Sequence, residues 1–307
     1  MEQEGIYHVP VLLKEVIEHL QIIPSGTYVD CTFGGGGHSR KILEQLNEEG
    51  KLIVFDQDKD AKKNIPPNDE RILFVPHNFS HLQRFLRFHK IEKVNGILAD
   101  LGISSHQINV PERGFSTRFN EDLDMRMNQD DPKTAADILK TYSEEKLHKI
   151  FEQYGEVTNS KTLAKTIVSI RKTHQLGTTK EFKDALYPVV KGNPEKYFAQ
   201  VFQALRIEVN DELGSLKRLL EQSIEVLEEG GRMVVITFHS LEDRLVKNFF
   251  KNENFEEEQA VDLFGKPQKK RLTIITKKPI IPSASELKAN PRSRSSKMRV
   301  AEKKFSN

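Results

Sequence analysis

The sequence has few of the residues that form covalent cross-links or membrane spans. It contains one cysteine, Cys31, and no tryptophan among 307 residues. A single cysteine excludes an intrachain disulfide and disfavours a zinc site built on cysteines. No apolar run is long enough to span a bilayer, and the acidic residues 1–5 lack the charged and apolar regions of a signal peptide. We therefore expect a protein that acts in the cytoplasm, without a membrane partner.

The net charge is small, but the basic residues are concentrated towards the end of the chain. There are 47 Lys or Arg against 45 Asp or Glu. Residues 266–304 hold thirteen of the Lys and Arg and only two glutamates. Such a segment favours a polyanionic partner such as RNA, although a solvated tail has the same composition. Arg292, Arg294, Lys297 and Arg299 alternate mostly with small residues, which suits an extended strand or arm.

The first hundred residues alternate between short apolar runs and helical segments. The apolar runs are 27–32, 52–56, 71–75 and 96–100. Continuous apolar runs between helical segments are typical of a parallel sheet that is covered on both faces. The sequence therefore predicts right-handed βαβ units in a doubly wound α/β fold.

The pattern changes near residue 108, where apolar residues begin to recur at helical spacing without a convincing strand. After a long helix expected at 211–229, a strand follows at 232–238, and 271–276 is the last strong strand. The simplest account is a sheet interrupted by a helical insertion. We expect a discontinuous core formed by residues 1–107 and 207–307. The inserted domain is expected at 108–206.

The most informative stretch is the glycine-rich turn at 30–39, which joins the first core strand to a helix. Glycine is needed where the backbone turns sharply or lies against a ligand, and nucleotide-like ligands bind at the carboxyl edge of a parallel sheet. The turn lacks the lysine of a phosphate-binding loop, and Ser39 stands where the dinucleotide fingerprint needs a glycine. It therefore disfavours a pyrophosphate ligand, and with it the alternative of a nicotinamide-dependent dehydrogenase.

Three of the predicted strands have an aspartate at their carboxyl ends: Asp30, Asp56 and Asp100. A carboxylate at the position of Asp56 can accept hydrogen bonds from both hydroxyls of a ribose. Acids around such a turn suit a ligand that carries a ribose and positive charge, and S-adenosylmethionine carries both. The alternative is that these acids only terminate their strands.

The chain resembles the bacterial 16S ribosomal RNA (cytosine-N4)-methyltransferase family, also described as the MraW or RsmH family. The motifs that carry the resemblance run in order along nearly the whole chain. They are 8–12 (HVPVL), 30–39 (DCTFGGGGHS), 98–107 (LADLGISSHQ), 112–116 (ERGFS), 123–127 (LDMRM), 202–207 (FQALRI), 238–244 (FHSLEDR) and 290–295 (NPRSRS). The chain departs from the usual family pattern at Asn109, Thr117 and Glu121-Asp122.

The resemblance implies a class I S-adenosylmethionine-dependent methyltransferase, a Rossmann-like doubly wound sheet with an inserted all-helical domain on the substrate side. It implies methylation of the exocyclic N4 amine of a cytidine in 16S rRNA, in the decoding region of the small ribosomal subunit. The substrate is either naked RNA or the assembled subunit. Contacts to the cofactor, S-adenosyl-L-methionine, are implied for Gly36, Gly37, His38, Asp56, Phe79, Asp100 and Gln107. Phe79 is expected beside the adenine.

Chemistry narrows the choice of methyl acceptor. Carbon-5 methylation of cytosine needs a cysteine that adds to the ring, and Cys31 lies in the cofactor turn. The Pro-Pro-aromatic element of DNA amino-methyltransferases is missing after Asp100. The amine must therefore be held differently. Either Asp100 or a neighbouring backbone carbonyl orients it, or Asp100 only positions the cofactor.

The sequence offers further candidates on the substrate side. His239 follows the fifth strand and is either a contact to the target base or phosphate, or a structural residue. Phosphate contacts are predicted for Arg113, Arg118, Arg126 and Arg171, with solvated surface as the alternative. We expect no metal, because methyl transfer needs none. A non-catalytic RNA-binding factor and a methyltransferase for proteins or small molecules are the rival functions.

Overall fold

The computed structural model describes residues 10–257 and 269–305, so His8 and Val9 of the first motif lie outside the described residues. The chain divides into two compact units. We call residues 1–102 with 214–307 the sheet unit, and residues 103–213 the helical unit. The insertion expected at 108–206 lies inside the helical unit.

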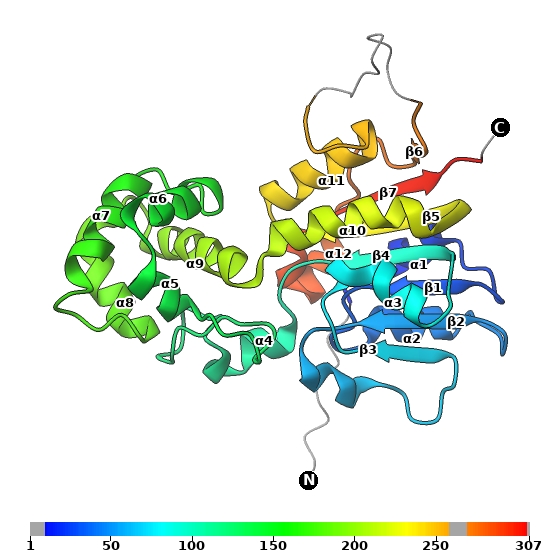
Figure 1. Cartoon of the computed structure of the whole chain (residues 1–307), viewed down its shortest axis with the longest axis horizontal. Helices are drawn as coiled ribbons and strands as arrows, with labels where there is room; N and C mark the ends of the chain where they lie inside the picture. Colours follow the sequence, from blue (N-terminus) through cyan, green and yellow to red (C-terminus); the bar gives the residue numbers. More distant parts are fainter. Residues whose placement is uncertain (1–9, 258–268, 306–307) are drawn as a thin grey trace. The chain divides into compact units, whose positions relative to one another are not determined.

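The described part of the sheet unit contains a single seven-stranded sheet (Figure 1). Its spatial order is β3-β2-β1-β4-β5-β7-β6. Strands β1 to β5 are parallel, and β7 runs antiparallel between β5 and β6. The chain moves outward from β1 to β3 and then returns to β4, so the strand order reverses beside β1. The strands are β1 Thr27–Asp30, β2 Lys51–Phe55, β3 Ile72–Val75, β4 Val94–Asp100, β5 Leu227–Thr237, β6 Leu272–Ile274 and β7 Lys297–Lys303.

Both faces of the sheet are buried. Side chains alternate along a strand, so Tyr28 and Val29 belong to two different core clusters, as do Leu98 and Ile97. Helices α1 and α2 supply residues to the cluster of Tyr28, and α3, α10 and α11 to that of Val29. The predicted doubly wound fold is therefore confirmed. These helices are α1 Leu13–Leu20, α2 Gly37–Leu43, α3 Leu82–Phe88, α10 Glu212–Val226 and α11 Ser240–Asn252, and the short α12 is Ala284–Ala289.

The expected boundary between the long helix and the fifth strand is wrong. Helix α10 ends at Val226, and β5 begins at Leu227, so the Gly230-Gly231 pair lies within the strand. Gly230 has a φ of 78°, and the register with β4 shifts between Val94 and Gly96. The glycines thus form a bulge in a continuous strand, where a sequence pattern suggests a break.

The strand expected at 271–276 is confirmed as β6, but it is not the last one, because β7 follows it within the basic segment. Met298 and Val300 are fully buried within β7. Arg299 is 8% exposed, and its Nε lies 2.6 Å from the Oδ1 of Asp243. Arg292 belongs to a 3-10 helix, so the extended conformation expected of the basic segment holds only from Lys297 onwards. The ion pair with Asp243 allows a basic residue to be buried, so a strand of the sheet can lie within a basic stretch of sequence.

The helical unit has helices and no strand among its described residues, as expected. Its core is separate from that of the sheet unit and includes Ile138, Phe151, Ile167, Phe182 and Leu205. No helix in the described ranges is both long and apolar enough to cross a membrane. The helices are α4 Ser105–Asn109, α5 Ala135–Thr141, α6 Glu144–Gln153, α7 Ser160–Ile170, α8 Thr179–Leu186 and α9 Pro194–Asn210.

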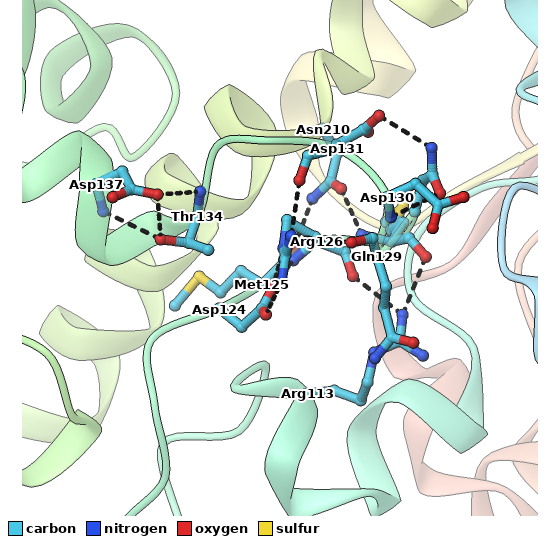
Figure 2. A network of polar contacts seen from close by, with 12 residues as sticks. Arg113, Asp124, Met125, Arg126, Gln129, Asp130, Asp131, Thr134, Asp137 and Asn210 are labelled. Atoms are coloured by element: carbon cyan, nitrogen blue, oxygen red, sulfur yellow. Dashed lines mark hydrogen bonds and ion pairs between the residues drawn. The ribbon is translucent and has the colours of Figure 1, made fainter.

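The segment that precedes α5 is fixed by buried polar contacts rather than by secondary structure (Figure 2). Asn210, the last residue of α9, accepts a hydrogen bond from the backbone N–H of Met127 at 2.7 Å. Its amide donates to the carbonyls of Met125 and Arg206, at 2.8 and 2.9 Å. One side chain therefore holds an irregular segment against the end of a helix.

Three of the four arginines predicted to contact phosphate have partners within the protein. Arg113 is 4% exposed, and its guanidinium donates to two backbone carbonyls in the segment that Asn210 holds (Figure 2). Arg126 forms an ion pair with Asp124 at 2.7 Å. Arg171 donates to two carbonyls at and beyond the end of α5. Arg118 is exposed, so the phosphate prediction remains open there.

We expect the substitution Asn210→Ala to lower the free energy of unfolding of the helical unit by about 2–4 kcal/mol, because it leaves buried backbone groups without partners. Urea denaturation followed by circular dichroism measures this loss. The matched control is Asn120→Ala, which removes one exposed hydrogen bond, to Lys180, and should cost about 1 kcal/mol or less. Equal losses in the two variants would contradict the role given to Asn210.

Candidate cofactor-binding and active site

The carboxyl ends of β1, β2 and β4 lie side by side at the point where the strand order reverses. Asp30 ends β1 and Asp100 ends β4, while Asp56 directly follows β2. Such a switch point is where open α/β sheets bind ligands. The structure therefore brings together the three acids that the sequence singles out.

The glycines of the turn between β1 and α2 are subject to different structural constraints. Gly36 has a φ of +72°, and a side chain on Gly37 would lie 2.2 Å from the Cγ of Pro10. These two glycines are thus required by the backbone and by packing. A side chain on Gly35 would meet nothing within 4 Å. The open side of the turn therefore lies at Gly35, and the contacts predicted for Gly36 and Gly37 stay predictions.

Asp30 holds the turn together from inside. It is 1% exposed, and its two carboxylate oxygens accept hydrogen bonds from the backbone N–H of Thr32 at 3.0 Å and the hydroxyl of Ser39 at 2.6 Å. The hydroxyl of Thr32 in turn accepts from the backbone N–H of Asp100 at 2.7 Å. Asp30 is therefore an anchor for the turn, a role that the sequence did not separate from ligand binding.

Asp56 is placed to accept hydrogen bonds from a ligand. Its two oxygens each accept one backbone N–H, from Gly34 and from Asp58, both at 2.8 Å. Burial raises the pKa of Asp56 to about 6, although these two hydrogen bonds act in the opposite direction. Each carboxylate oxygen has a second lone pair, so both can still accept a hydroxyl. The residue thus fits the two hydroxyls of a ribose.

Asp100 is the least satisfied acid at this edge of the sheet. Its Oδ1 is buried and finds no hydrogen-bond partner among the described residues. Burial raises its pKa well above the ordinary value, and the negative charges of Asp30 and Glu242 raise it further. A cation or an N–H donor close to Asp100 would relieve this cost. The carboxylates at this edge of the sheet therefore fit a positively charged ligand.

His38 fastens α2 to the segment before α1. It is 6% exposed, and its Nε2 lies 2.9 Å from the carbonyl oxygen of Val11. Burial lowers the pKa of His38, so the neutral ring donates its Nε2–H to that carbonyl. Its Nδ1 lies 3.7 Å from the Oδ2 of Asp100. One edge of the ring is therefore committed to the fold, and the predicted contact to the cofactor remains a prediction.

The other two predicted cofactor contacts lie in different units. Phe79 opens a short 3-10 helix soon after β3 and packs on the core cluster of Val29. Asn78, beside it, donates to the side chain of Gln57 at 2.9 Å, which links this segment to the residue after Asp56. Gln107 lies in the helical unit, where it closes the capping box of α4. Their roles in binding stay predictions.

His239 directly precedes α11 and lies two residues beyond Thr237, where β5 ends. Its side chain is 9% exposed, and its Nε2 lies 3.3 Å from the Oε1 of Glu242. Glu242 is 3% exposed and also accepts the backbone N–H of Phe238 at 2.8 Å. The sequence assigned no role to Glu242, although its position three residues after His239 places both on one face of the helix start.

A family model described as the MraW methylase family matches residues 5–304. The chain belongs to this family. The relatives named ribosomal RNA small subunit methyltransferase H include one from Bacteroides thetaiotaomicron, 52% identical over 99% of this chain and 100% of the relative. Another, from Flavobacterium psychrophilum, is 51% identical over 95% and 100%. The sheet of this methylase is accordingly that of a class I methyltransferase, as the resemblance implied.

Solved structures that resemble the chain are much more distant from it. A putative rRNA-methylase from Clostridium thermocellum has a TM-score of 0.45 and is 11% identical, over 96% of this chain and 99% of that one. A putative methyltransferase from Streptococcus mutans, solved in complex with SAH, has a TM-score of 0.43 at the same identity, over 96% and 99%.

The backbone amide of Gly34 should report the ionisation of Asp56, because it donates to that carboxylate. We expect its NMR chemical shift to titrate with a midpoint near pH 6, and the substitution Asp56→Asn to abolish the transition. Below this pH one oxygen of Asp56 is protonated and no longer accepts hydrogen bonds as a carboxylate oxygen does, so a ribose should bind more weakly. A midpoint near 3.8, the ordinary value, would show that the site is not desolvated.

Proposed function

We propose that this protein methylates the exocyclic N4 amine of a cytidine in 16S rRNA, in the decoding region of the small ribosomal subunit. The broader assignment, an S-adenosylmethionine-dependent rRNA methyltransferase, is supported by the family and by the names of relatives that are half identical over the full chain. Because its substrate belongs to the ribosome, we expect the protein to act in the cytoplasm.

The cofactor is S-adenosyl-L-methionine, and the unsatisfied carboxylate of Asp100, at the same edge of the sheet as Asp56, is the observation that best supports its place in the site. When bound, it supplies a methyl group that is activated by a positive sulfur. Asp56 would accept the two ribose hydroxyls, and Asp100 would either face the positive charge or orient the target amine. Holding donor and acceptor in line is the main task of the protein, and alignment of this kind is worth about 7–11 kcal/mol.

The amine of cytosine is a poor nucleophile, because its lone pair is delocalised into the ring. An acceptor for one N–H orients the remaining lone pair towards the methyl group. Asp100 suits this task, because a carboxylate with a raised pKa accepts both a hydrogen bond and, after transfer, a proton. His239 is the second candidate, for contact with the target base or its phosphate.

The position of Cys31 disfavours the competing reaction at carbon 5. That reaction needs a thiolate that adds to the cytosine ring. Cys31 is 2% exposed within the core cluster of Val29, and burial raises the pKa of its thiol. It is the only cysteine of the chain. Transfer to the exocyclic amine needs no such nucleophile.

The identity of the product is the decisive measurement. Unmodified 16S rRNA and unmodified small subunits are each incubated with the protein and methyl-labelled S-adenosylmethionine, and the nucleosides are then separated by mass spectrometry. We expect the label in N4-methylcytidine, and the better substrate of the two shows whether assembly is required. Label in 5-methylcytidine, or in neither RNA from a protein that binds the cofactor, would refute the proposal.

Asp100→Asn distinguishes the two roles open to Asp100. If this side chain orients the amine, kcat falls about 100-fold or more while the Kd of S-adenosylmethionine changes little. Asp56→Asn is the matched control, because it makes the same change at the ribose site. It should raise the cofactor Kd about tenfold or more and leave kcat at saturation within a few-fold. An equal rise in Kd for Asp100→Asn would assign Asp100 to the cofactor alone.

A further inference from the structure

The sheet unit contains a pocket of about 430 Å³ to which the proposed reaction assigns only one wall residue, His239, the second candidate for contact with the target base or its phosphate. It lies between the end of β5, at Phe238 and His239, and the start of β7, at Lys297. Thr237 is paired with Lys297 in the antiparallel register, so the pocket lies at the same edge of the sheet as the cofactor turn. Its other walls come from Ser240, Ile281, Pro282, Leu287 and residues 294–296.

Two buried polar side chains in the pocket wall have unused hydrogen-bonding capacity. Ser296 is 1% exposed, and its hydroxyl finds no partner among the described residues. Neither ring nitrogen of His239 has a hydrogen bond within the described part of the chain, although Nε2 lies 3.3 Å from Glu242. An unsatisfied buried polar group costs about 1–3 kcal/mol, a cost that a ligand with polar edges removes.

The rim of the pocket is positive. Arg294 is exposed and has no ion-pair partner in the described ranges. Lys297 lies 3.4 Å from Asp243, but that carboxylate is already held at 2.6 Å by Arg299. One carboxylate cannot neutralise both cations near it, so Lys297 and Arg294 keep positive charge at the rim, while the negative charge of Glu242 lies beside His239. This arrangement fits a phosphate group.

The remaining wall is apolar and partly open. Ile281 is 65% exposed, and Leu287 and Phe238 are half-buried beside it. An apolar surface next to polar edges and a cationic rim matches the three parts of a nucleotide, which are the base face, the base or ribose edge, and the phosphate. Single-stranded RNA is usually recognised in this way, through unstacked bases.

We infer that this pocket binds a nucleotide of the RNA that neighbours the methyl acceptor. The inference rests on the proposed function, because it takes the substrate to be RNA. The acceptor itself must lie about 3–3.5 Å from the methyl group. The pocket walls that follow β5 and begin β7 are one and two strands away from β4 and Asp100, roughly 5 and 10 Å at about 4.8 Å for each strand. The pocket therefore holds an adjacent nucleotide, with its phosphate against Arg294 and Lys297.

Arg294→Ala tests the phosphate contact, and Arg292→Ala is its matched control. Both arginines are exposed and lie in the 3-10 helix Pro291–Ser295, but Arg292 does not line the pocket. We expect Arg294→Ala to raise the KM for RNA about tenfold, with kcat and the Kd of S-adenosylmethionine unchanged, and Arg292→Ala to raise it less than about twofold. Equal effects of the two substitutions would show that the basic surface attracts RNA without a specific phosphate site, and would overturn the inference.

Ser296→Ala tests the base or ribose contact, and thermal unfolding separates this effect from misfolding. A hydroxyl without a partner is not needed for stability, so the variant should unfold at the temperature of the unmodified protein or above it. We expect the KM for RNA to rise about fivefold or more. An unchanged KM would mean that no RNA group reaches this hydroxyl.

Direct binding distinguishes a nucleotide site from a simple anion site. Uridine and adenosine monophosphates, with inorganic phosphate as the comparison, are titrated into the full-length protein saturated with S-adenosylmethionine, and the NMR signals of Ser296 and Ile281 are followed. A nucleoside monophosphate should bind more tightly than phosphate and shift both signals. Equal binding of phosphate, or shifts elsewhere, would overturn the inference. This assay needs no methyl transfer, so its outcome is independent of the product analysis.

Discussion

The position of one buried carboxylate underlies the geometry of the whole site. Asp30 ties the end of β1 to the turn and to the start of α2, through hydrogen bonds to Thr32 and Ser39. Thr32 also links the turn to β4, because its hydroxyl accepts a hydrogen bond from the backbone N–H of Asp100. Loss of Asp30 would leave several buried donors without an acceptor. The acids proposed to bind the ligand therefore depend on an acid whose two oxygens already accept hydrogen bonds from the turn.

The three acids at the sheet edge differ in how much of their charge is compensated. Asp30 is surrounded by donors, Asp56 has two, and the Oδ1 of Asp100 has none among the described residues. Burial raises the pKa of both Asp56 and Asp100. Both would be stabilised by a ligand that brings hydroxyls and positive charge. The electrostatic cost of the site thus lies at the two acids that are proposed to contact the cofactor.

Several arginines of this chain have partners within the fold. Arg113 and Arg171 donate to backbone carbonyls, and Arg299 neutralises Asp243 inside the sheet unit. These contacts satisfy irregular backbone and a buried carboxylate that packing alone would leave unpaired. The arginines that remain exposed, such as Arg118 and Arg294, are the ones available to an RNA backbone.

The local sequence determined the elements that depend on neighbouring residues. The apolar runs that end at Asp56 and Asp100 and the glycine turn predict the parallel sheet and its ligand edge, because buried strands and tight turns have strong local patterns. Only the tertiary structure decided which charges are buried, since Arg299 finds Asp243 across 56 residues of chain. It alone gave Asp30 its structural role and formed the pocket at Ser296. A residue type specifies which bonds are possible, whereas its partners are set by segments that meet only in the fold.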